Sequence, residues 1–405
     1  MHSRSIKVLL VSSSSGSAGG GESYLYHLAV GLSRLGHRVQ TICSTAPEMD
    51  KLAEKLATIG EVRRIQYINT YQRPTRCIGA ALDLAQQLRL RRIFQDCRPD
   101  VLHINQQVAE DGLDLILAAR NAGIPFLSTI HIARSAKELH ARFGRLRDAV
   151  AREVLRSTNA THITVAERAK HELTTRFPFL DSNRVRVVPN GVFFPDSNAA
   201  TRDGARTRWG VVPGDLVLGS VGRLEAQKAP IFALKIVAAL KRRGFPVRYV
   251  WIGDGAMRTA FQECAQQFDI ADFVHVDGWR DDVSLCLQAL DVFLMPSNFE
   301  GMPLALLEAM AAGVCCCASD VDGMAEVIED GLSGYLCARG SLDSWCRQIE
   351  PLLVNPALRG AIGSSAKRVA GERFGVERMA KDTVKVYAAV TSKSPQARTL
   401  FNSIS

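Results

Sequence analysis

Short apolar runs alternate with amphipathic stretches along most of the chain, and this alternation predicts parallel sheets covered by helices. Residues 6–11 form the first apolar run, and a loop rich in serine and glycine follows it. The next stretch repeats leucine every three or four residues up to Gly36 and then gives way to a second apolar run at 39–43. This order predicts a strand, a helix and a parallel strand, with glycines 19–21 at the first turn.

The same pattern continues and then restarts. Further strands are predicted at 101–104, 125–130, 160–165 and 184–188. Residues 193–210 lose periodicity and gain turn formers, so they are predicted to be a linker. A second strand–helix series begins at Leu216 and includes a helix at 232–240. Two such series predict an α/β protein with two Rossmann-like domains, residues 1–198 and 199–373, which face each other across a cleft.

Residues 291–323 are the most informative part of the second series. An apolar run at 292–295 is followed by a predicted helix at 304–311 and a second strand at 314–318. Pro303 suits the first helical position, because its missing N–H needs no partner there. The free N–H groups of a helix start attract anions, and Gly301 lets a ligand approach closely. Glu300 beside such an anion site indicates a functional carboxylate.

Composition fits a two-domain protein in a reducing cytoplasm. The 405 residues exceed what one core usually supports, and 47% hydrophobic with 22% charged residues is ordinary for a globular protein. No apolar run approaches the ~20 residues of a membrane span, and no charged and then apolar leader opens the chain. The ten cysteines include no CxxC pair, and the nine histidines form no ligand-spaced cluster. We therefore expect no structural metal, and we expect Cys315, Cys316 and Cys317 to be small core residues.

The net charge of +9 lies entirely in the first half, where residues 1–198 carry 27 Lys and Arg against 18 Asp and Glu. An anionic partner is therefore expected: a phosphate-bearing substrate or a membrane surface, and not a nucleic acid. Residues 133–156 suit one helix with an apolar stripe, made of Leu139, Phe143, Leu146, Val150 and Val154. Its basic side is either a solvated face, which we favour, or a face that docks on anionic lipid.

Several chemically capable residues follow strand ends, and in open α/β sheets this edge binds ligands. Arg223 and Lys228 follow one strand, and glycine turns follow others. Two cations, a helix start and glycine turns describe a diphosphate site that needs no metal. His131 follows a strand of the first series, whereas His103 lies inside a strand and is predicted to be structural.

These segments resemble the retaining glycosyltransferases of family 4, which have the GT-B fold. Glu300 and Glu308, with seven residues between them in FEGMPLALLEAMAAG, resemble the EX7E motif of that family. GGGESYLYHLAVGLSRLGHRV resembles its opening loop and helix, VVPNGV its interdomain motif, and GSVGRLEAQKAP its diphosphate-binding segment. WIGDG and EVIEDGLSGYL are also similar to family segments, so the likeness covers most of the chain.

The resemblance implies a hexosyltransferase that is independent of metals and of cofactors. It would move a sugar from a UDP-, GDP- or ADP-sugar to a glycan, lipid-linked or small-molecule acceptor, in envelope glycolipid or exopolysaccharide assembly. The implied location is cytoplasmic, peripheral on the inner face of the membrane. The resemblance implies that Glu300 and His131 are catalytic. It implies that the donor sugar and ribose are bound by Glu300, Gly301 and Glu308, and the nucleobase by Asp277, Gly278 and Trp279. The residues implied to bind the donor diphosphate are Gly20, Gly21, Arg223, Lys228, Met302 and Leu304.

The chain departs from the family pattern at Asp322, which stands at a common glycine, and at Asn105, which stands at a common histidine. The resemblance also implies that a helix at 374–391 packs back on the first domain, before a frayed tail at 392–405. Other readings stay open: a non-hydrolysing nucleotide-sugar epimerase, or a catalytically inactive nucleotide-sugar-binding subunit. A dinucleotide-dependent oxidoreductase is weaker, because no clean GxGxxG follows the first strand.

Overall fold

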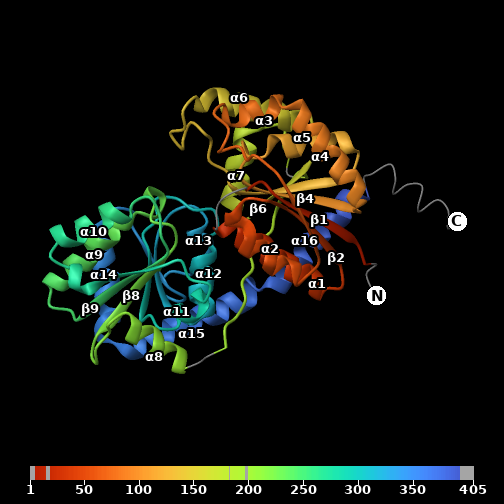
Figure 1. The fold of residues 1–405 in the computed structure, drawn as a ribbon. Helices are drawn as coiled ribbons and strands as arrows, with labels where there is room; N and C mark the ends of the chain where they lie inside the picture. The colour runs from red at the N-terminus through yellow and green to blue at the C-terminus, as the bar shows by residue number, and fades with distance from the viewer. Residues whose placement is uncertain (1–4, 15–18, 182, 197–198, 393–405) are drawn as a thin grey trace. The chain divides into compact units, whose positions relative to one another are not determined.

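The chain folds into two compact units, each built on one parallel sheet (Figure 1). Unit 1 contains Met1–Gly191 and Val376–Ser405, and unit 2 contains Val192–Gly375. The computed structural model describes residues 5–14, 19–181, 183–196 and 199–392. Residues 15–18 of the glycine loop and 393–405 of the predicted tail lie outside the described residues. The α/β architecture with two Rossmann-like sheets is confirmed.

Unit 1 has a seven-stranded sheet with the order β3-β2-β1-β4-β5-β6-β7, and every pair is parallel. Parallel strands are covered on both faces, so their interiors are apolar. Leu9, Leu102 and Leu127 are fully buried in this sheet. The strands are β1 (Lys7–Ser12), β2 (Arg38–Ser44), β3 (Glu61–Ile65), β4 (Val101–Val108), β5 (Phe126–Ile132), β6 (Thr161–Thr164) and β7 (Val185–Val187).

The helices of unit 1 form two groups. One group packs α3, α4, α5 and α6 on one another, and the other packs α1, α2 and α16 together. The helices are α1 (Gly20–Arg34), α2 (Asp50–Ala57), α3 (Arg76–Leu82), α4 (Leu84–Cys97), α5 (Leu113–Ala122), α6 (Gly144–Arg156), α7 (Glu167–Arg176) and α16 (Val376–Thr391).

The last helix, α16, returns to unit 1 and packs against α1, as expected. A Cβ at Gly31 would lie 2.7 Å from the Cβ of Ala380, so only glycine allows this close approach. Met379, Val386 and Tyr387 of α16 are buried, whereas Val384 is partly buried.

The predicted helix at 133–156 is wrong in its first half. The helix α6 begins only at Gly144, because Phe143 adopts a left-handed conformation with φ 56° and interrupts the chain before it. A side chain at residue 144 would also collide with the backbone of Lys137, 2.7 Å from its Cβ. Phe143 and Leu146 are exposed rather than buried, so the continuous apolar stripe does not exist.

Unit 2 has a six-stranded parallel sheet with the order β10-β9-β8-β11-β12-β13. Its strands are β8 (Leu216–Val221), β9 (Val247–Ile252), β10 (Val274–Gly278), β11 (Val292–Met295), β12 (Cys315–Ser319) and β13 (Tyr335–Cys337). Its helices are α8 (Ala199–Arg208), α9 (Pro230–Arg242), α10 (Arg258–Gln267), α11 (Val283–Leu287), α12 (Leu304–Ala311), α13 (Met324–Val327), α14 (Leu342–Val354) and α15 (Pro356–Arg373).

The segment at 291–323 follows the prediction closely. The strand β11 and the helix α12 have the predicted bounds, and β12 begins one residue later than expected. Cys315, Cys316 and Cys317 are buried and free, so their prediction as small core residues is confirmed. Within the part of the chain that the structure describes, no helix is long and apolar enough to cross a membrane.

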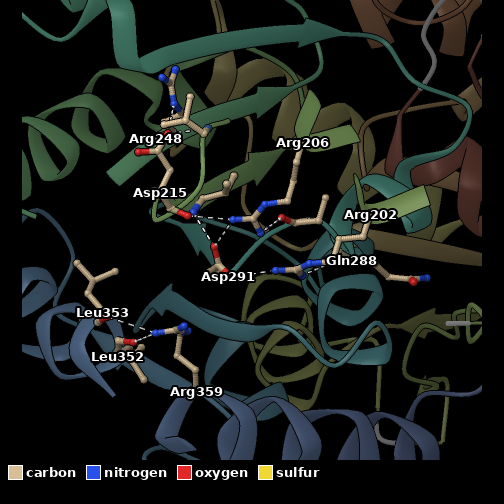
Figure 2. A network of polar contacts seen from close by, with 12 residues as sticks. Arg202, Arg206, Asp215, Arg248, Gln288, Asp291, Leu352, Leu353 and Arg359 are labelled. Atoms are coloured by element: carbon tan, nitrogen blue, oxygen red, sulfur yellow. Dashed lines mark hydrogen bonds and ion pairs between the residues drawn. The ribbon is translucent and has the colours of Figure 1, made fainter. Parts of the chain in front are cut away.

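The predicted linker at 193–210 contains a helix instead, α8, and Figure 2 shows why it is ordered. Arg202 and Arg206 reach from α8 to the two carboxylate oxygens of Asp291, at 3.2 and 3.0 Å. Asp291 also accepts the backbone N–H of Val217 at 2.7 Å. This single, largely buried carboxylate therefore connects α8 to β8 and to the start of β11. Such long-range ion pairs leave no periodic signal in the sequence.

Candidate active site

The strand ends of unit 2 bring Lys228 and Glu300 together. Lys228 closes a short 3₁₀ turn after β8, and its Nζ lies 2.6 Å from Oε1 of Glu300, in the loop before α12. Gln227 adds a donor: its Nε2 lies 3.1 Å from the carbonyl of Phe299 and 3.4 Å from Oε2 of Glu300. Both charged side chains are largely buried, so water screens this pair weakly.

Asp322 holds the backbone of the same loop. Its Oδ2 accepts the N–H of Glu300 at 3.1 Å. Asp322 is buried and left-handed, with φ 44°, which is a conformation that glycine adopts freely and Asp tolerates. The departure from the family glycine is therefore compatible with the backbone, and it supplies an additional hydrogen bond at the predicted catalytic residue.

The glycine turns of unit 2 serve the protein's own packing. A Cβ at Gly253 would lie 2.1 Å from the carbonyl oxygen of Gly222, and one at Gly255 would lie 2.7 Å from the backbone of Leu224. The two strand-end turns therefore press against each other. Arg223, in the first of these turns, pairs with Glu225 at 3.1 Å and stays about half exposed.

The predicted ribose ligand, Glu308, lies on α12 and is partly buried. Removal from water raises the pKa of its carboxyl to about 7. Among the described residues, no side chain forms an ion pair or hydrogen bond with this carboxyl, so its hydrogen-bonding capacity is open to a ligand. Pro303 is the N-cap and α12 begins at Leu304, so Pro303 stands one position earlier than predicted, with Met302 and Leu304 buried beside it.

The predicted nucleobase turn divides into an anchored part and an open part. Arg208 of α8 donates two hydrogen bonds to Asp277, at 3.1 and 3.0 Å, and the Asp277 side chain is only 4% exposed. Asp277 therefore fixes the turn to α8. Gly278 is left-handed, with φ 69°, and partly buried, whereas Trp279 is 56% exposed and its side chain is accessible.

In unit 1, Asn105 joins two predicted site residues. His131 lies near the end of β5, and its Nε2 is 2.8 Å from Oδ1 of Asn105 on the neighbouring β4. Asn105 Nδ2 donates to the carbonyl of Gly21 at 2.8 Å. Burial lowers the pKa of His131 to about 4, so its imidazole is neutral near pH 7. A neutral ring that donates from Nε2 keeps Nδ1 as an acceptor.

A second buried network supports this one. His103 contacts Thr129 through Nε2 at 2.7 Å and the hydroxyl of Tyr387 through Nδ1 at 2.8 Å. The hydroxyl of Tyr24 lies 2.9 Å from the same Thr129, and its ring meets the His131 ring edge-on, with centroids 4.7 Å apart. His103 is therefore structural, as predicted, and connects α16 to the sheet beside His131.

The two predicted diphosphate glycines at the start of α1 differ in their surroundings. A Cβ at Gly21 would lie 1.7 Å from Nε2 of Gln107, so the end of that flexible side chain would have to move for any larger residue. A Cβ at Gly20 would meet no atom of the described residues within 4 Å. Gly20 is exposed at a helix start, where backbone N–H groups attract anions.

Two family models cover these two halves of the chain. Residues 18–193 match Glycosyltransferase Family 4, and residues 202–369 match Glycosyl transferases group 1. The chain belongs to the GT-B glycosyltransferases. The matches fall on the two sheets, one in each unit.

Two relatives and one solved structure share between 18% and 34% sequence identity with this glycosyltransferase. The UDP-Gal:alpha-D-GlcNAc-diphosphoundecaprenol alpha-1,3-galactosyltransferase of Escherichia coli is 27% identical over 67% of the chain and 71% of that relative. EpsF of Bacillus subtilis is 34% identical over 54% of the chain, which spans only 56% of that protein. The crystal structure of Anabaena Alr3699/HepE with UDP-glucose aligns with a TM-score of 0.78 at 18% identity, over 95% of this chain and all of that one, which shows the fold.

Sequence reasoning missed four residues that organise the site of this glycosyltransferase: Gln227, Asp322, Arg208 and Asn105. Asp322 and Asn105 were noted only as departures from the family pattern, and such departures next to motif residues were the available signal. Arg208 lies in the stretch that was predicted to be a linker, so nothing in the local sequence connected it to Asp277.

Proposed function

We propose that the protein is a retaining hexosyltransferase that moves a sugar from a nucleotide-diphosphate sugar to an acceptor hydroxyl. The observation that carries the proposal is the ion pair of Lys228 and Glu300 beside the start of α12. A buried lysine held by a carboxylate is a preorganised cation, and the adjacent helix start adds backbone donors. This combination suits a leaving diphosphate.

We assign roles residue by residue. Lys228 and Arg223, with the amides at Met302 and Leu304, take the charge that develops on the leaving diphosphate. Glu300 and Gly301 contact the donor sugar, and Glu308 accepts hydrogen bonds from the ribose. Gly278 and Trp279 seat the base on a turn that Asp277 anchors, and Gly20, Gly21 and His131 contribute from unit 1.

The reaction proposed here is independent of metals. In comparable sites, one fixed donor that stabilises the developing charge contributes roughly 3–4 kcal/mol to catalysis. Fixed cations and amides around a leaving group act in the same way. In the described part of the chain, no group of three or more His, Cys, Asp or Glu residues is placed to hold a metal ion. The retained anomeric configuration rests on the resemblance to family 4 and on no distance within the site.

Uracil is the base to test first, as UDP or a UDP-sugar, and the first acceptor to test is lipid-linked or a glycan. The E. coli relative is named for transfer from UDP-Gal to a diphosphoundecaprenol-linked sugar, and the HepE crystal holds UDP-glucose. We further propose work in envelope glycolipid or exopolysaccharide assembly, at the cytoplasmic face of the membrane. The basic excess of residues 1–198 suits an anionic surface there.

A thermal-shift panel of UDP, GDP, ADP and their sugars tests the donor assignment. A ligand that binds the folded state raises Tm in proportion to the logarithm of its saturation, and we expect the largest rise with UDP or a UDP-sugar. Liquid chromatography with mass spectrometry of the same mixtures, after addition of a lipid-linked acceptor, then separates the alternatives, because chromatography resolves an epimerised donor that has the same mass as the original. Acceptor-linked sugar supports the transferase, an isomerised donor supports an epimerase, and donor binding without either product supports an inactive subunit.

A further inference from the structure

A basic groove lies in unit 1 between the edge strand β3 and the helix α4. Its volume is about 590 Å³, and four arginines line it: Arg63 and Arg64 from β3, and Arg89 and Arg92 from α4. None of these residues has a part in the proposed transfer reaction. Because β3 is the outermost strand of its sheet, the groove lies at an edge that no further strand of the described residues covers.

Most of the charge in this groove is not neutralised by the protein. Arg64 pairs with Asp50 at 2.7 Å. Arg89 reaches only the carbonyl of Gln66, at 3.2 Å, and Arg63 only the sulfur of Cys97, at 4.0 Å. Within the described residues, no carboxylate pairs with Arg63, Arg89 or Arg92. Such a concentration of unpaired guanidinium groups attracts phosphate, which they bind in a fork geometry.

Exposed leucines border the same groove. Leu88 lines it and is 53% exposed, while Leu84, one turn earlier on α4, is 69% exposed. Leu82, at the end of α3, is 74% exposed. Residues four apart on a helix share a face, so Leu84, Leu88 and Arg92 form one row along α4. A soluble phosphate ligand needs no apolar border, whereas a phospholipid presents both a phosphate and an apolar boundary.

We propose that this groove binds the phosphate headgroup of an anionic phospholipid, with Leu82, Leu84 and Leu88 entering the boundary of the acyl chains. The inference rests on the membrane partner named under the proposed function and locates it on β3 and α4. The proposed membrane contact therefore lies on β3 and α4, and not on the basic face at 133–156. Figure 1 shows α3 and α4 together on unit 1.

The test is cosedimentation of the full chain with phosphatidylglycerol vesicles and with phosphatidylcholine vesicles, without any donor. We compare the double variant Arg89→Glu/Arg92→Glu with a matched variant, Arg145→Glu/Arg152→Glu, which reverses two exposed arginines of α6. Each basic residue near an anionic surface contributes a several-fold factor, so the groove variant should bind phosphatidylglycerol at least about tenfold more weakly. The α6 variant should bind like the unaltered chain, and phosphatidylcholine should bind none of them.

A second variant, Leu84→Ser/Leu88→Ser, keeps the charge and should also weaken vesicle binding, by about threefold or more. Glycerol phosphate at millimolar concentration should not displace the protein from vesicles. The proposal is overturned if the α6 variant loses binding and the groove variant keeps it, if neutral vesicles bind equally well, or if glycerol phosphate saturates the groove and releases the protein. The thermal shift with UDP, measured on every variant, reports the proposed transferase function separately.

Discussion

The two site clusters, one in each unit, are built on opposite principles. In unit 2, Glu300 and Lys228 are charged, face each other at 2.6 Å, and would exchange that contact for a ligand's charges. In unit 1, His131 is neutral and is held by Asn105 and by the edge of Tyr24. Removing one charged partner leaves the other charge largely buried and unpaired, so stability has to be measured beside catalysis there, as it does for the neutral network, which contributes to folding and to positioning together.

The largest effect is expected from Lys228→Met. This change removes the cation from the leaving-group side and leaves the carboxylate of Glu300 without its partner. We expect kcat/KM for sugar transfer to fall at least a hundredfold, about 2.7 kcal/mol of transition-state stabilisation. The measurement is initial-rate kinetics with a UDP-sugar. Lys235→Met, at an exposed position of α9, is the matched control and should retain full activity; equal activity of the two variants would remove Lys228 from the mechanism.

A smaller effect is expected from Asn105→Ala, which releases His131 and the carbonyl of Gly21. We expect kcat to fall about tenfold, with a loss of about 1–2 kcal/mol in unfolding free energy and little change in UDP affinity. Asn121→Ala, at an exposed position on α5, serves as the control.

Asn105→Asp distinguishes positioning from mere stability. It keeps an acceptor for Nε2 of His131 but adds a negative charge, which raises the pKa of an imidazole. The acid limb of the pH–rate profile should therefore move to higher pH. A profile that stays in place, with activity lost only in proportion to stability, would make Asn105 a purely structural residue.

The smallest expected effect concerns the stability of each unit as a function of pH, which changes in opposite directions in the two units. The pKa of Glu308 is raised to about 7, so the folded state of unit 2 binds this proton more tightly than the unfolded chain does. Its stability is greatest below about pH 4.5 and falls as pH rises through about 7. His103 and His131 have pKa values lowered to about 3 and 4, so unit 1 loses stability as pH falls below about 6.5.

All four tryptophans lie in unit 2, so their fluorescence follows the unfolding of that unit. In urea titrations at pH 5 and pH 8, Glu308→Gln should reduce the loss of stability between the two pH values by about 1 kcal/mol, after allowance for its partial exposure. A variant with the same pH dependence as the unaltered chain would contradict the raised pKa of Glu308.

The comparison also explains what the sequence could predict. The bounds of β11 and α12 followed from an apolar run, a proline and a glycine, all of which act within a few residues. Lys228 and Glu300 were predicted separately, because each follows a strand end, and parallel topology brings such ends to one edge.

Long-range polar partners were beyond the reach of sequence patterns. The helix α8 depends on Asp291, which lies far along the chain from Arg202, so its segment looked like a linker. The interruption before α6 coincides with two left-handed residues, His140 and Phe143, in a sequence whose spacing suited a continuous helix. Asn105 acts from β4 through two hydrogen bonds and Asp322 through one to the backbone of the Glu300 loop, and no period or composition marks either residue.

The central claim, that Glu300 acts on the donor sugar beside a preorganised cation, is tested most directly with Glu300→Gln. This variant keeps the shape of the side chain and removes its charge, and Asp322 still accepts the backbone N–H of residue 300. Sugar transfer from the nucleotide sugar is measured by mass spectrometry, and UDP affinity by calorimetry, on the same preparation. We predict that transfer falls at least about a hundredfold while UDP affinity stays within about threefold. Unchanged transfer in a variant that still binds UDP would contradict the account.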